Sequence, residues 1–458
     1  MALKLLTRMS LLLPGNRSAK GIKLSKQMKY YRLLRNAQWE PAAVLQRRQA
    51  EMLYHIAMFA LEYVPHYREL HIDKKDFNIE NITEKIQEFP ILTKDIIRNE
   101  GKRLCAQQPI NDWLYTNTSG GTTGEPVTFF QTGRFFDADQ GAKLLYDEWA
   151  GRRIGDKQIR LWGSERDIVS GKKDWMNKIY RSVRNEMFLN TFVMSEANMD
   201  YFIEQINQQQ PAMILAYVQS IRELALYIKH KGRKVFSPRG IMTSAGTLSP
   251  EVGKLIGDVF NCPVFNRYGS RELGDMACSC NKAEGLHINT ESCFIEILDN
   301  ADKRCPNGTR GRIVVTSLTN EGMPIIRYDI GDIGILTDHV CSCGRGFPML
   351  QNVTGRTIDI FVAKNGAFVD GEYFTHLFYD KANVKQFQVI QETVELIRVK
   401  MVLLDKKKNM EDEYMDMTVN IQKAMGEVSV QFDLVDDIPL SQSGKRIYTI
   451  SRVYGGNE

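Results

Sequence analysis

Helical and strand-like spacings of apolar residues alternate along this chain. Residues 42–64 (AAVLQRRQAEMLYHIAMFALEYV) place apolar side chains at helical spacing, and PHYREL then breaks the pattern, so the chain opens with helices. Strand patterns and further helix-like segments follow; the strands are expected at Ile313–Leu318, Phe294–Leu298 and around Ile241, and the helices at Ile221–His230 and Pro250–Phe260. This mixture predicts an α/β fold with a large sheet system.

The pattern changes after Gly355. Two strand-like runs, FQVIQE and VELIRVKMVLL, precede a polar helix near Asp412–Met425 and a further strand, VSVQFDLV. Strand, strand, helix and strand indicate a small α+β unit. We therefore place a domain boundary near residues 354–360, with a large domain at 1–354 and a small one at 355–458.

Composition adds that the chain is of the soluble globular class. Of its 458 residues 43% are hydrophobic and 25% are charged, and no run approaches the roughly 18 apolar residues that span a bilayer. MSLLLPG near the start is too short for the apolar region of a signal peptide. We expect a cytoplasmic protein.

The net charge of +5 is distributed unevenly. Residues 1–50 contain eleven Lys and Arg and one acid, Glu40, which gives +10 and leaves −5 for the remainder. A basic, partly amphipathic start is typical of a solvated helix face, and it leaves open a peripheral contact with the inner face of a membrane or a lipid-linked glycan. Only Tyr30 and Tyr31 interleave with these charges, so we expect no nucleic-acid partner.

One stretch concentrates glycines and small hydroxyls. Residues 116–126 read TNTSGGTTGEP, where glycines allow close approach to the backbone and Ser and Thr add short donors. Such a loop can surround an anion, and phosphate is the obvious candidate. A flexible polar loop is the alternative if these residues are considered alone.

Four more short stretches follow in a fixed order: NRYGSRELG from Asn266, IIRYDIGD from Ile325, VTGRTID from Val353 and PLSQSGKR from Pro439. Together with TSGGTTG, they resemble the motif series of the adenylate-forming enzymes. The chain is most similar to the phenylacetate-CoA ligase family, including its branch associated with capsular polysaccharide biosynthesis. FPILTKDIIRNEG and PHYREL extend the resemblance to almost the whole chain.

The resemblance implies the adenylate-forming architecture, with a large multi-sheet N-terminal domain and a small mobile α+β C-terminal domain. It also implies a reaction in which ATP activates a small carboxylic acid to an acyl-adenylate and releases pyrophosphate. Catalysis then consists mostly of positioning and of stabilising charge on the phosphates. The residue types in the motifs suit that demand.

The implied nucleotide site draws on three motifs. The phosphate loop is Thr118, Ser119, Gly120, Gly121, Thr122, Thr123 and Gly124, which contains no lysine. Tyr268, with Gly269 and Ser270, offers a face for adenine, and Glu272 offers a hard oxygen for Mg²⁺. Asp332 can accept hydrogen bonds from both ribose hydroxyls. A salt-bridged surface position is the alternative reading of these charged residues.

Two basic residues complete the implied catalytic set. Arg356 lies where the family places an arginine near the ribose and phosphate, and Lys445 lies where it places a lysine that reaches the carboxylate and the α-phosphate. Taken in isolation, Lys445 would be a solvated surface residue. A point charge on a flexible stem suits a group that must arrive and leave.

Some positions depart from the family pattern. Ile330 and Ile358 replace residues that are often polar in relatives, although Asp359 is kept, and KNGAFVDGEYF only loosely follows the segment used in thioester formation. Adenylation is therefore a firmer expectation than transfer to CoA. CoA is the leading acceptor, and an amine or hydroxyl of a capsule or O-antigen precursor is the alternative.

The cysteines form two close clusters. CSCNKAEGLH holds Cys278, Cys280 and His287, and CSCGRGF holds Cys341 and Cys343. Spacing alone leaves free buried thiols as an equal alternative to a zinc site. The resemblance favours zinc, because relatives carry a cysteine at the position of Cys280, a histidine in GLH and a CxCGR motif. We expect structural zinc on Cys280, His287, Cys341 and Cys343, with Cys278 in reserve.

A non-catalytic nucleotide-binding scaffold is the remaining alternative. Retention of Glu272, Asp332, Arg356 and Lys445 argues against it, because a binding-only protein would not need the late lysine. The sequence does not identify the acid; Trp162, Tyr217 and Ser244–Gly246 are plausible walls of its pocket, although Trp162 is equally a core residue.

Overall fold

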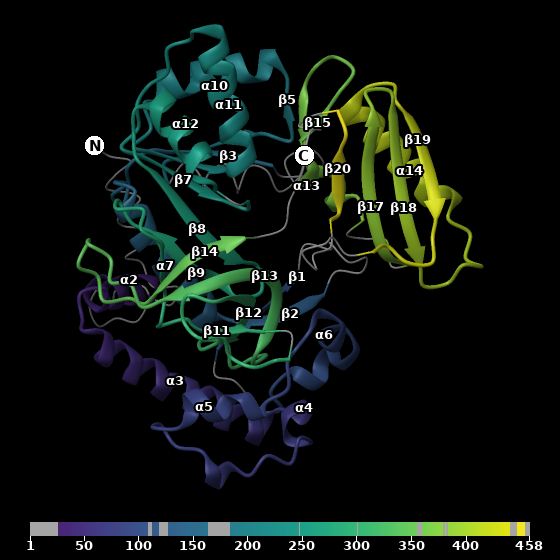
Figure 1. Ribbon diagram of the computed structural model, residues 1–458. Helices are drawn as coiled ribbons and strands as arrows, with labels where there is room; N and C mark the ends of the chain where they lie inside the picture. The colour runs from purple at the N-terminus through teal and green to yellow at the C-terminus, as the bar shows by residue number, and fades with distance from the viewer. Residues whose placement is uncertain are drawn as a thin grey trace, which may run out of the picture. The chain divides into compact units, whose positions relative to one another are not determined.

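The computed structural model describes residues 26–108, 112–118, 127–163, 184–246, 248–299, 301–354, 360–378, 381, 383–439 and 447–453 (Figure 1). Internal contacts divide the chain into two compact units. The first comprises residues 1–119, 127–155 and 265–355, and the second comprises 120–126, 156–264 and 356–458. Among the described residues, no helix combines the length and apolar character needed to cross a membrane.

The first unit is built on an antiparallel sheet and a set of N-terminal helices. Its sheet has the order β11–β12–β13–β14–β10–β9–β8. The strands are β8 (Val264–Ser270), β9 (Gly274–Ser279), β10 (Leu286–Ile288), β11 (Cys293–Leu298), β12 (Arg310–Ser317), β13 (Tyr328–Thr337) and β14 (Met349–Thr354). A separate hairpin pairs β1 (Leu114–Thr118) with β2 (Thr128–Thr132).

The helices of the first unit supply one side of its core. They are α2 (Lys26–Ala37), α3 (Ala42–Tyr63), α4 (Pro65–Arg68), α5 (Ile82–Lys85), α6 (Lys94–Glu100) and α7 (Gly133–Trp149). Buried residues of α3, such as Leu53 and Ile56, join Ile313 and Val315 of β12 in one apolar cluster. In Figure 1, α3, α4 and α5 lie below β11 and β12, and α6 lies to the right of these strands. Burial of this apolar face, rather than helix propensity alone, stabilises α3.

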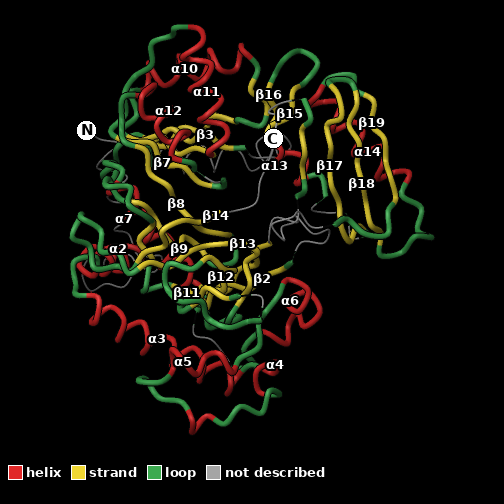
Figure 2. Tube along the Cα trace, viewed as in Figure 1, coloured by secondary structure: helices red, strands yellow, loops and turns green. Residues whose placement is uncertain are grey.

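The second unit contains a parallel sheet and its crossover helices. The sheet has the order β7–β6–β3–β4. Its elements are β3 (Gln158–Trp162), β4 (Glu186–Asn190), α10 (Glu196–Gln209), β6 (Met213–Tyr217), α11 (Val218–Lys231), β7 (Gly240–Ser244) and α12 (Pro250–Phe260). Figure 2 shows these helices beside the strands. Ser249 caps α12 by accepting from Val252 N, and Pro250 supplies the fixed φ of its first turn.

The C-terminal residues of the second unit form a four-stranded sheet of order β19–β18–β17–β20. Its elements are β17 (Val384–Thr393), β18 (Leu396–Leu403), α14 (Glu411–Met425), β19 (Ser429–Leu434) and β20 (Thr449–Ser451). A small sheet joins β15 (Ile360–Val362) and β16 (Phe368–Asp370) to β5 (Val193–Met194), followed by α13 (Gly371–His376). This sheet links residues 360–370 to the parallel-sheet region.

The predicted helices and strands are confirmed, and the structure contains many further elements. Every predicted helix and strand is present, and α12 has the predicted bounds. The elements that were not predicted include helices α2, α7 and α10, most strands of the two units' large sheets, the β15–β16 hairpin, and β20, which is three residues long and pairs in parallel with β17. The division between the units at 355/356 coincides with the predicted boundary, although the second unit also contains residues 156–264, so the domain limits stay a prediction.

Candidate functional site

The adenine and ribose residues predicted from the sequence lie in contact. The hydroxyl of Tyr268 in β8 donates to Asp332 Oδ2 of β13 at 3.0 Å, although 64 residues separate the two. Both side chains are half-buried, so each keeps a face open to solvent. An aromatic face and an adjacent carboxylate form a combination that suits a nucleoside, with stacking for the base and acceptors for the sugar hydroxyls.

A bulge in the β8–β9 pair shapes the chain beside Tyr268. The register shifts between Tyr268 and Gly269, and a Cβ built on Gly269 would lie 2.6 Å from the Gly274 carbonyl oxygen. Only glycine fits such a close approach. From α7, Asp139 Oδ1 accepts from Asp275 N at 3.0 Å, and Asp139 also pairs with Lys143. The Asp139–Lys143 ion pair of α7 therefore supports the bulge, and neither residue was predicted from the sequence.

The loop with the predicted magnesium ligand is tied to the hairpin that flanks the phosphate loop. Gln131 of β2 is fully buried, and its Nε2 donates to the carbonyl oxygens of Arg271, at 2.8 Å, and Glu272, at 3.2 Å. Asn117 Nδ2 of β1 donates to the same Arg271 carbonyl at 3.2 Å. Among the described residues, the buried Glu272 carboxylate forms no salt bridge, which suits a metal ligand.

The structure describes only part of the predicted phosphate and catalytic residues. Thr118 ends β1, and its backbone N donates to Asn117 Oδ1 at 3.0 Å. The other predicted residues lie outside the described residues: the rest of the phosphate loop (Ser119, Gly120, Gly121, Thr122, Thr123 and Gly124), Ile358 and Asp359, and the two basic catalytic residues Arg356 and Lys445. Their roles stay predictions.

The four predicted zinc ligands come together in the first unit. One ligand atom from each of Cys280, His287, Cys341 and Cys343 lies within 4.8 Å of the others. The Sγ atoms of Cys280 and Cys341 are 3.6 Å apart, and Cys343 Sγ lies 3.4 Å from His287 Nε2. Tetrahedral zinc with Zn–S bonds of about 2.3 Å requires ligand separations of about 3.7 Å. The donor set therefore fits zinc in both chemistry and spacing.

Surrounding contacts orient this cluster. His287 Nδ1 lies 3.4 Å from the Phe347 carbonyl oxygen, which directs Nε2 toward the sulfur atoms, and burial lowers the pKa of His287 to about 4. Glu284 accepts from Ser342 N at 3.0 Å and pairs with His339 at 2.8 Å, so it joins the loops that carry the ligands. Hydrogen bonds from Ser342 lower the pKa of Glu284 to about 2.

Cys278 lies apart from this group. It is buried within β9, opposite His287 in the β9–β10 ladder, and burial raises the pKa of its thiol well above the usual range. Cys278, the alternative ligand in the prediction, therefore does not belong to the group of four candidate zinc ligands.

The suggested acyl-pocket residues lie at the carboxyl ends of neighbouring parallel strands. Trp162 ends β3 and Tyr217 ends β6, and their ring centroids are 4.0 Å apart. Ser244 ends β7, which pairs with β6. Ligands of open parallel sheets bind at this edge. Tyr217 is only 5% exposed, so much of this pair packs as core, and its role toward a substrate stays a prediction.

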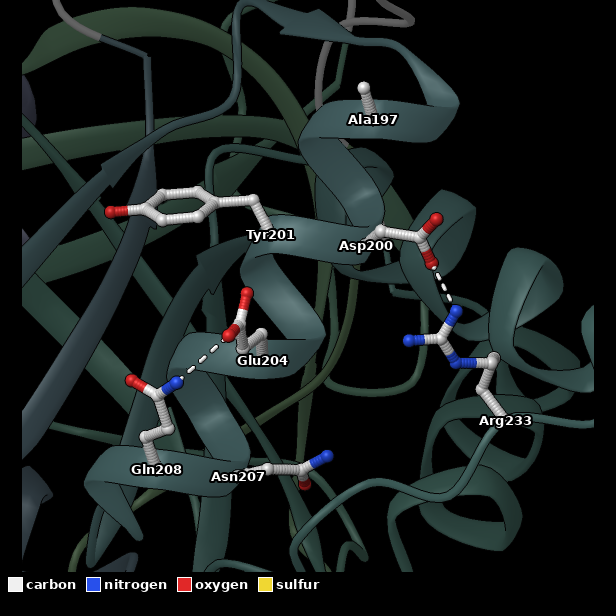
Figure 3. A pocket seen from close by; sticks show the side chains of 7 residues that line it. All are labelled: Ala197, Asp200, Tyr201, Glu204, Asn207, Gln208 and Arg233. Atoms are coloured by element: carbon white, nitrogen blue, oxygen red, sulfur yellow. Dashed lines mark hydrogen bonds and ion pairs between the residues drawn. The ribbon is translucent and has the colours of Figure 1, made fainter.

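A surface groove of about 680 Å³ lies elsewhere, on α10 (Figure 3). Its polar side chains bind one another: Asp200 pairs with Arg233 at 2.7 Å, and Gln208 donates to Glu204 at 2.9 Å. None of the predicted site residues lines it. A groove whose charges are already paired offers little to a ligand, and we assign it no role in the reaction.

Part of the positive charge near the N-terminus is neutralised by ion pairs within the first unit. Residues 1–25 lie outside the described residues. On α2, Arg35 pairs with Glu148 at 3.3 Å and Lys26 lies 3.9 Å from Asp112, whereas Lys29 and Arg32 are exposed. The described part of this region therefore combines ion pairs within the unit with a small exposed basic face.

Comparison with known proteins extends these observations. Residues 361–452 match the family model of the CapK C-terminal domain. Over 418 residues the chain is 24% identical to Protein CapK of Staphylococcus aureus, and the matched region covers 89% of each chain. It is 24% identical over 339 residues to phenylacetate-coenzyme A ligase of Thermus thermophilus, which covers 71% of this chain and 73% of the relative.

A solved structure shares the fold over nearly the full length. The 2-hydroxyisobutyryl-CoA ligase, in complex with 2-HIB-AMP and CoA in the thioesterification state, gives a TM-score of 0.62 at 18% identity over 92% of both chains. Together these comparisons confirm the fold class and the resemblance: the chain has the fold of the adenylate-forming ligases and is similar to the phenylacetate-CoA ligases and to CapK. The similarity to CapK spans 89% of this chain, against 71% for the phenylacetate-coenzyme A ligase of Thermus thermophilus.

Proposed function

We propose that the protein activates a small carboxylic acid with ATP and then transfers the acyl group to CoA. The contact between Tyr268 and Asp332 is the observation that carries this proposal, because it joins a base-stacking ring to a sugar-binding carboxylate. In the first step a carboxylate oxygen attacks the α-phosphorus, the bond to the β-phosphate oxygen breaks, and pyrophosphate leaves. In the second step the CoA thiolate attacks the acyl carbon and AMP leaves.

The chain's residues divide this work. Tyr268 stacks the adenine and Asp332 accepts from the ribose hydroxyls, while residues 118–124 bind the β- and γ-phosphates through backbone N–H and hydroxyl groups. Glu272 would hold Mg²⁺, which supplies charge neutralisation on the phosphates. By resemblance, Arg356 contacts the ribose and phosphate, and Lys445 stabilises charge at the α-phosphate.

The experiment is an exchange screen with labelled pyrophosphate. Enzyme, ATP and Mg²⁺ are incubated with aryl acids, uronic acids and amino acids in turn, and label entering ATP is measured. We expect exchange that depends on at least one acid. Binding of ATP with no exchange for any acid class would favour the non-catalytic scaffold and contradict the proposal.

Transfer to an amine or hydroxyl of a surface-glycan precursor is the second candidate. The match of residues 361–452 to the CapK C-terminal domain favours it, and so does the loose agreement of KNGAFVDGEYF with the thioester-forming segment. An anionic, lipid-linked precursor would suit the exposed basic residues Lys29 and Arg32 and would bring the protein to a membrane surface. Mass analysis after incubation with CoA separates the two candidates: a thioester supports CoA transfer, and AMP without a thioester contradicts it.

We also propose that Cys280, His287, Cys341 and Cys343 bind structural zinc. Four protein ligands close the coordination shell and leave no position for a substrate water, so the ion would fix the β9–β10 turn to the segment before β14.

Metal analysis of protein purified without added metal should give about one zinc per chain. Cys341→Ser should lower this content, whereas Cys262→Ser, which changes an isolated thiol, should not. Equal zinc content in both variants, or none in the unaltered protein, would contradict the assignment.

A further inference from the structure

Asp332 lies on an irregular stretch of β13. In the β12–β13 pair, Arg312 lies opposite Ile333 and Val314 lies opposite Asp329. One residue of β12 therefore faces three residues of β13, 330–332, and regular ladder pairing does not fix these three. The direction of the Asp332 side chain consequently depends on contacts outside the ladder.

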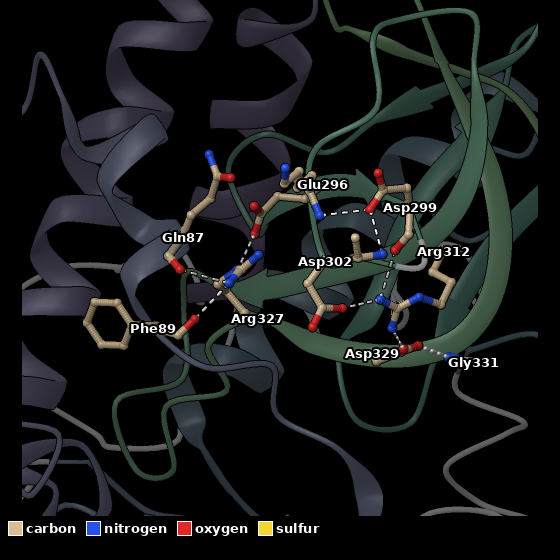
Figure 4. Close-up of polar contacts among 11 residues, drawn as sticks. Gln87, Phe89, Glu296, Asp299, Asp302, Arg312, Arg327, Asp329 and Gly331 are labelled. Carbon is tan, nitrogen blue, oxygen red and sulfur yellow. Dashed lines mark hydrogen bonds and ion pairs between the residues drawn. The ribbon is translucent and has the colours of Figure 1, made fainter.

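Asp329 and Arg312 supply such contacts. Gly331 has a φ of 82°, a left-handed conformation, and its N donates to Asp329 Oδ1 at 3.0 Å. The other carboxylate oxygen, Oδ2, accepts from Arg312 Nη1 at 2.5 Å. Arg312 Nη2 donates to the Asp302 carboxylate and, at 3.1 Å, to the Asp299 carbonyl oxygen (Figure 4). The guanidinium therefore ties the bulge to the turn after β11.

The chain immediately before the bulge is anchored independently. Asp329 N donates to the Leu92 carbonyl oxygen, and Leu92 N donates to the Arg327 carbonyl oxygen, each at 2.9 Å. The buried Arg327 side chain donates to Glu296 at 3.1 Å and to the Phe89 carbonyl oxygen at 2.7 Å (Figure 4). Loss of the Arg312 contact would thus leave the start of β13 in place and loosen residues 330–332.

We propose that Arg312 is a positioning residue for ribose recognition: through Asp329 and the Gly331 N–H it holds the bulge that directs Asp332. The inference rests on the proposed ribose role of Asp332. A planar guanidinium can bind two acceptors in fixed directions, which a more flexible or neutral side chain does not reproduce. Without it, Asp332 remains present but samples other directions, so the sugar contacts weaken while the base and phosphate contacts persist.

The test compares the binding of ATP with that of 2′,3′-dideoxy-ATP by calorimetry, which requires no knowledge of the acid. Arg312→Met should raise the Kd for ATP about tenfold and the Kd for the dideoxy nucleotide less than about twofold. Arg304→Met is the matched control, because Arg304 is equally exposed, at 28% against 29%, and binds Glu296 rather than the bulge. It should leave the ratio of the two Kd values unchanged.

Further variants keep the test decisive. If Arg312→Met does not fold, Asp329→Asn, which retains an oxygen for Gly331 N and loses the ion pair, should give the same selective loss. In an Asp332→Asn background, Arg312→Met should add no further loss for ATP. Equal losses for both nucleotides, no loss, or a selective loss in Arg304→Met would overturn the inference. If the Kd values change as expected but the unaltered protein shows no pyrophosphate exchange, only the proposed reaction would be overturned.

Discussion

The hydrogen bond from Tyr268 to Asp332 can be removed without removing the aromatic ring. Tyr268→Phe retains the face that we assign to adenine and deletes only the hydroxyl that donates to Asp332 Oδ2 at 3.0 Å. A hydrogen bond to a charged group contributes about 1.5–3 kcal/mol, and water replaces part of it because both side chains are half-buried. We therefore expect ATP binding to weaken by about 1–2 kcal/mol, or about 5- to 30-fold.

The assay is calorimetric titration with ATP, followed by the pyrophosphate exchange rate at saturating ATP. The exchange rate should change much less than the Kd, because the lost contact orients the sugar and does not touch the α-phosphate. Tyr414→Phe is the control, since it removes the same hydroxyl from α14, which carries none of the predicted nucleotide residues. An unchanged Kd for ATP in Tyr268→Phe, or an equal loss in Tyr414→Phe, would refute the reasoning.

Two predictions concern the supports of the site. Gln131→Leu removes the donor to the Glu272 carbonyl and one of the two donors to the Arg271 carbonyl, so the free energy of unfolding should fall by roughly 1–3 kcal/mol and the Mg²⁺ requirement for exchange should rise. An unchanged denaturant midpoint and unchanged Mg²⁺ dependence would contradict this role of Gln131. Glu284→Gln weakens the charge-assisted bonds to Ser342 and His339, so a chelator should remove zinc from the variant faster than from the unaltered protein. Equal rates of zinc release would show that these bonds do not hold the zinc ligands in place.

Residues with strong chemical character could be predicted from the sequence. The resemblance carried by the motif series implied that Tyr268 and Asp332 bind the nucleotide, and the structure brings these two residues into contact. The spacing of the cysteines left zinc and free buried thiols equally open, and the resemblance favoured four metal ligands, whose ligand atoms lie together in the structure. Apolar periodicity located α3 and α12 because each buries one face, which fixes the spacing of its apolar residues.

The supports of the site could not be predicted in this way. Gln131 reaches backbone carbonyl groups 140 residues away, and such a bond requires a particular partner position but no particular partner side chain. The bulge at 330–332 depends on the register between β12 and β13, which periodicity does not specify. Strand β20 has only three residues, too few to show alternation, and it exists because it adds to the edge of β17.

The most direct test of the account is acid-dependent exchange of labelled pyrophosphate into ATP by the unaltered protein and by Lys445→Ala. Lysine at this position is expected to stabilise charge that develops in the transition state, so its loss should lower exchange by about 100-fold or more while ATP binding persists. The account predicts exchange with at least one carboxylic acid and its near-abolition in the variant. Release of ADP and phosphate in place of AMP and pyrophosphate, or full exchange by Lys445→Ala, would contradict it.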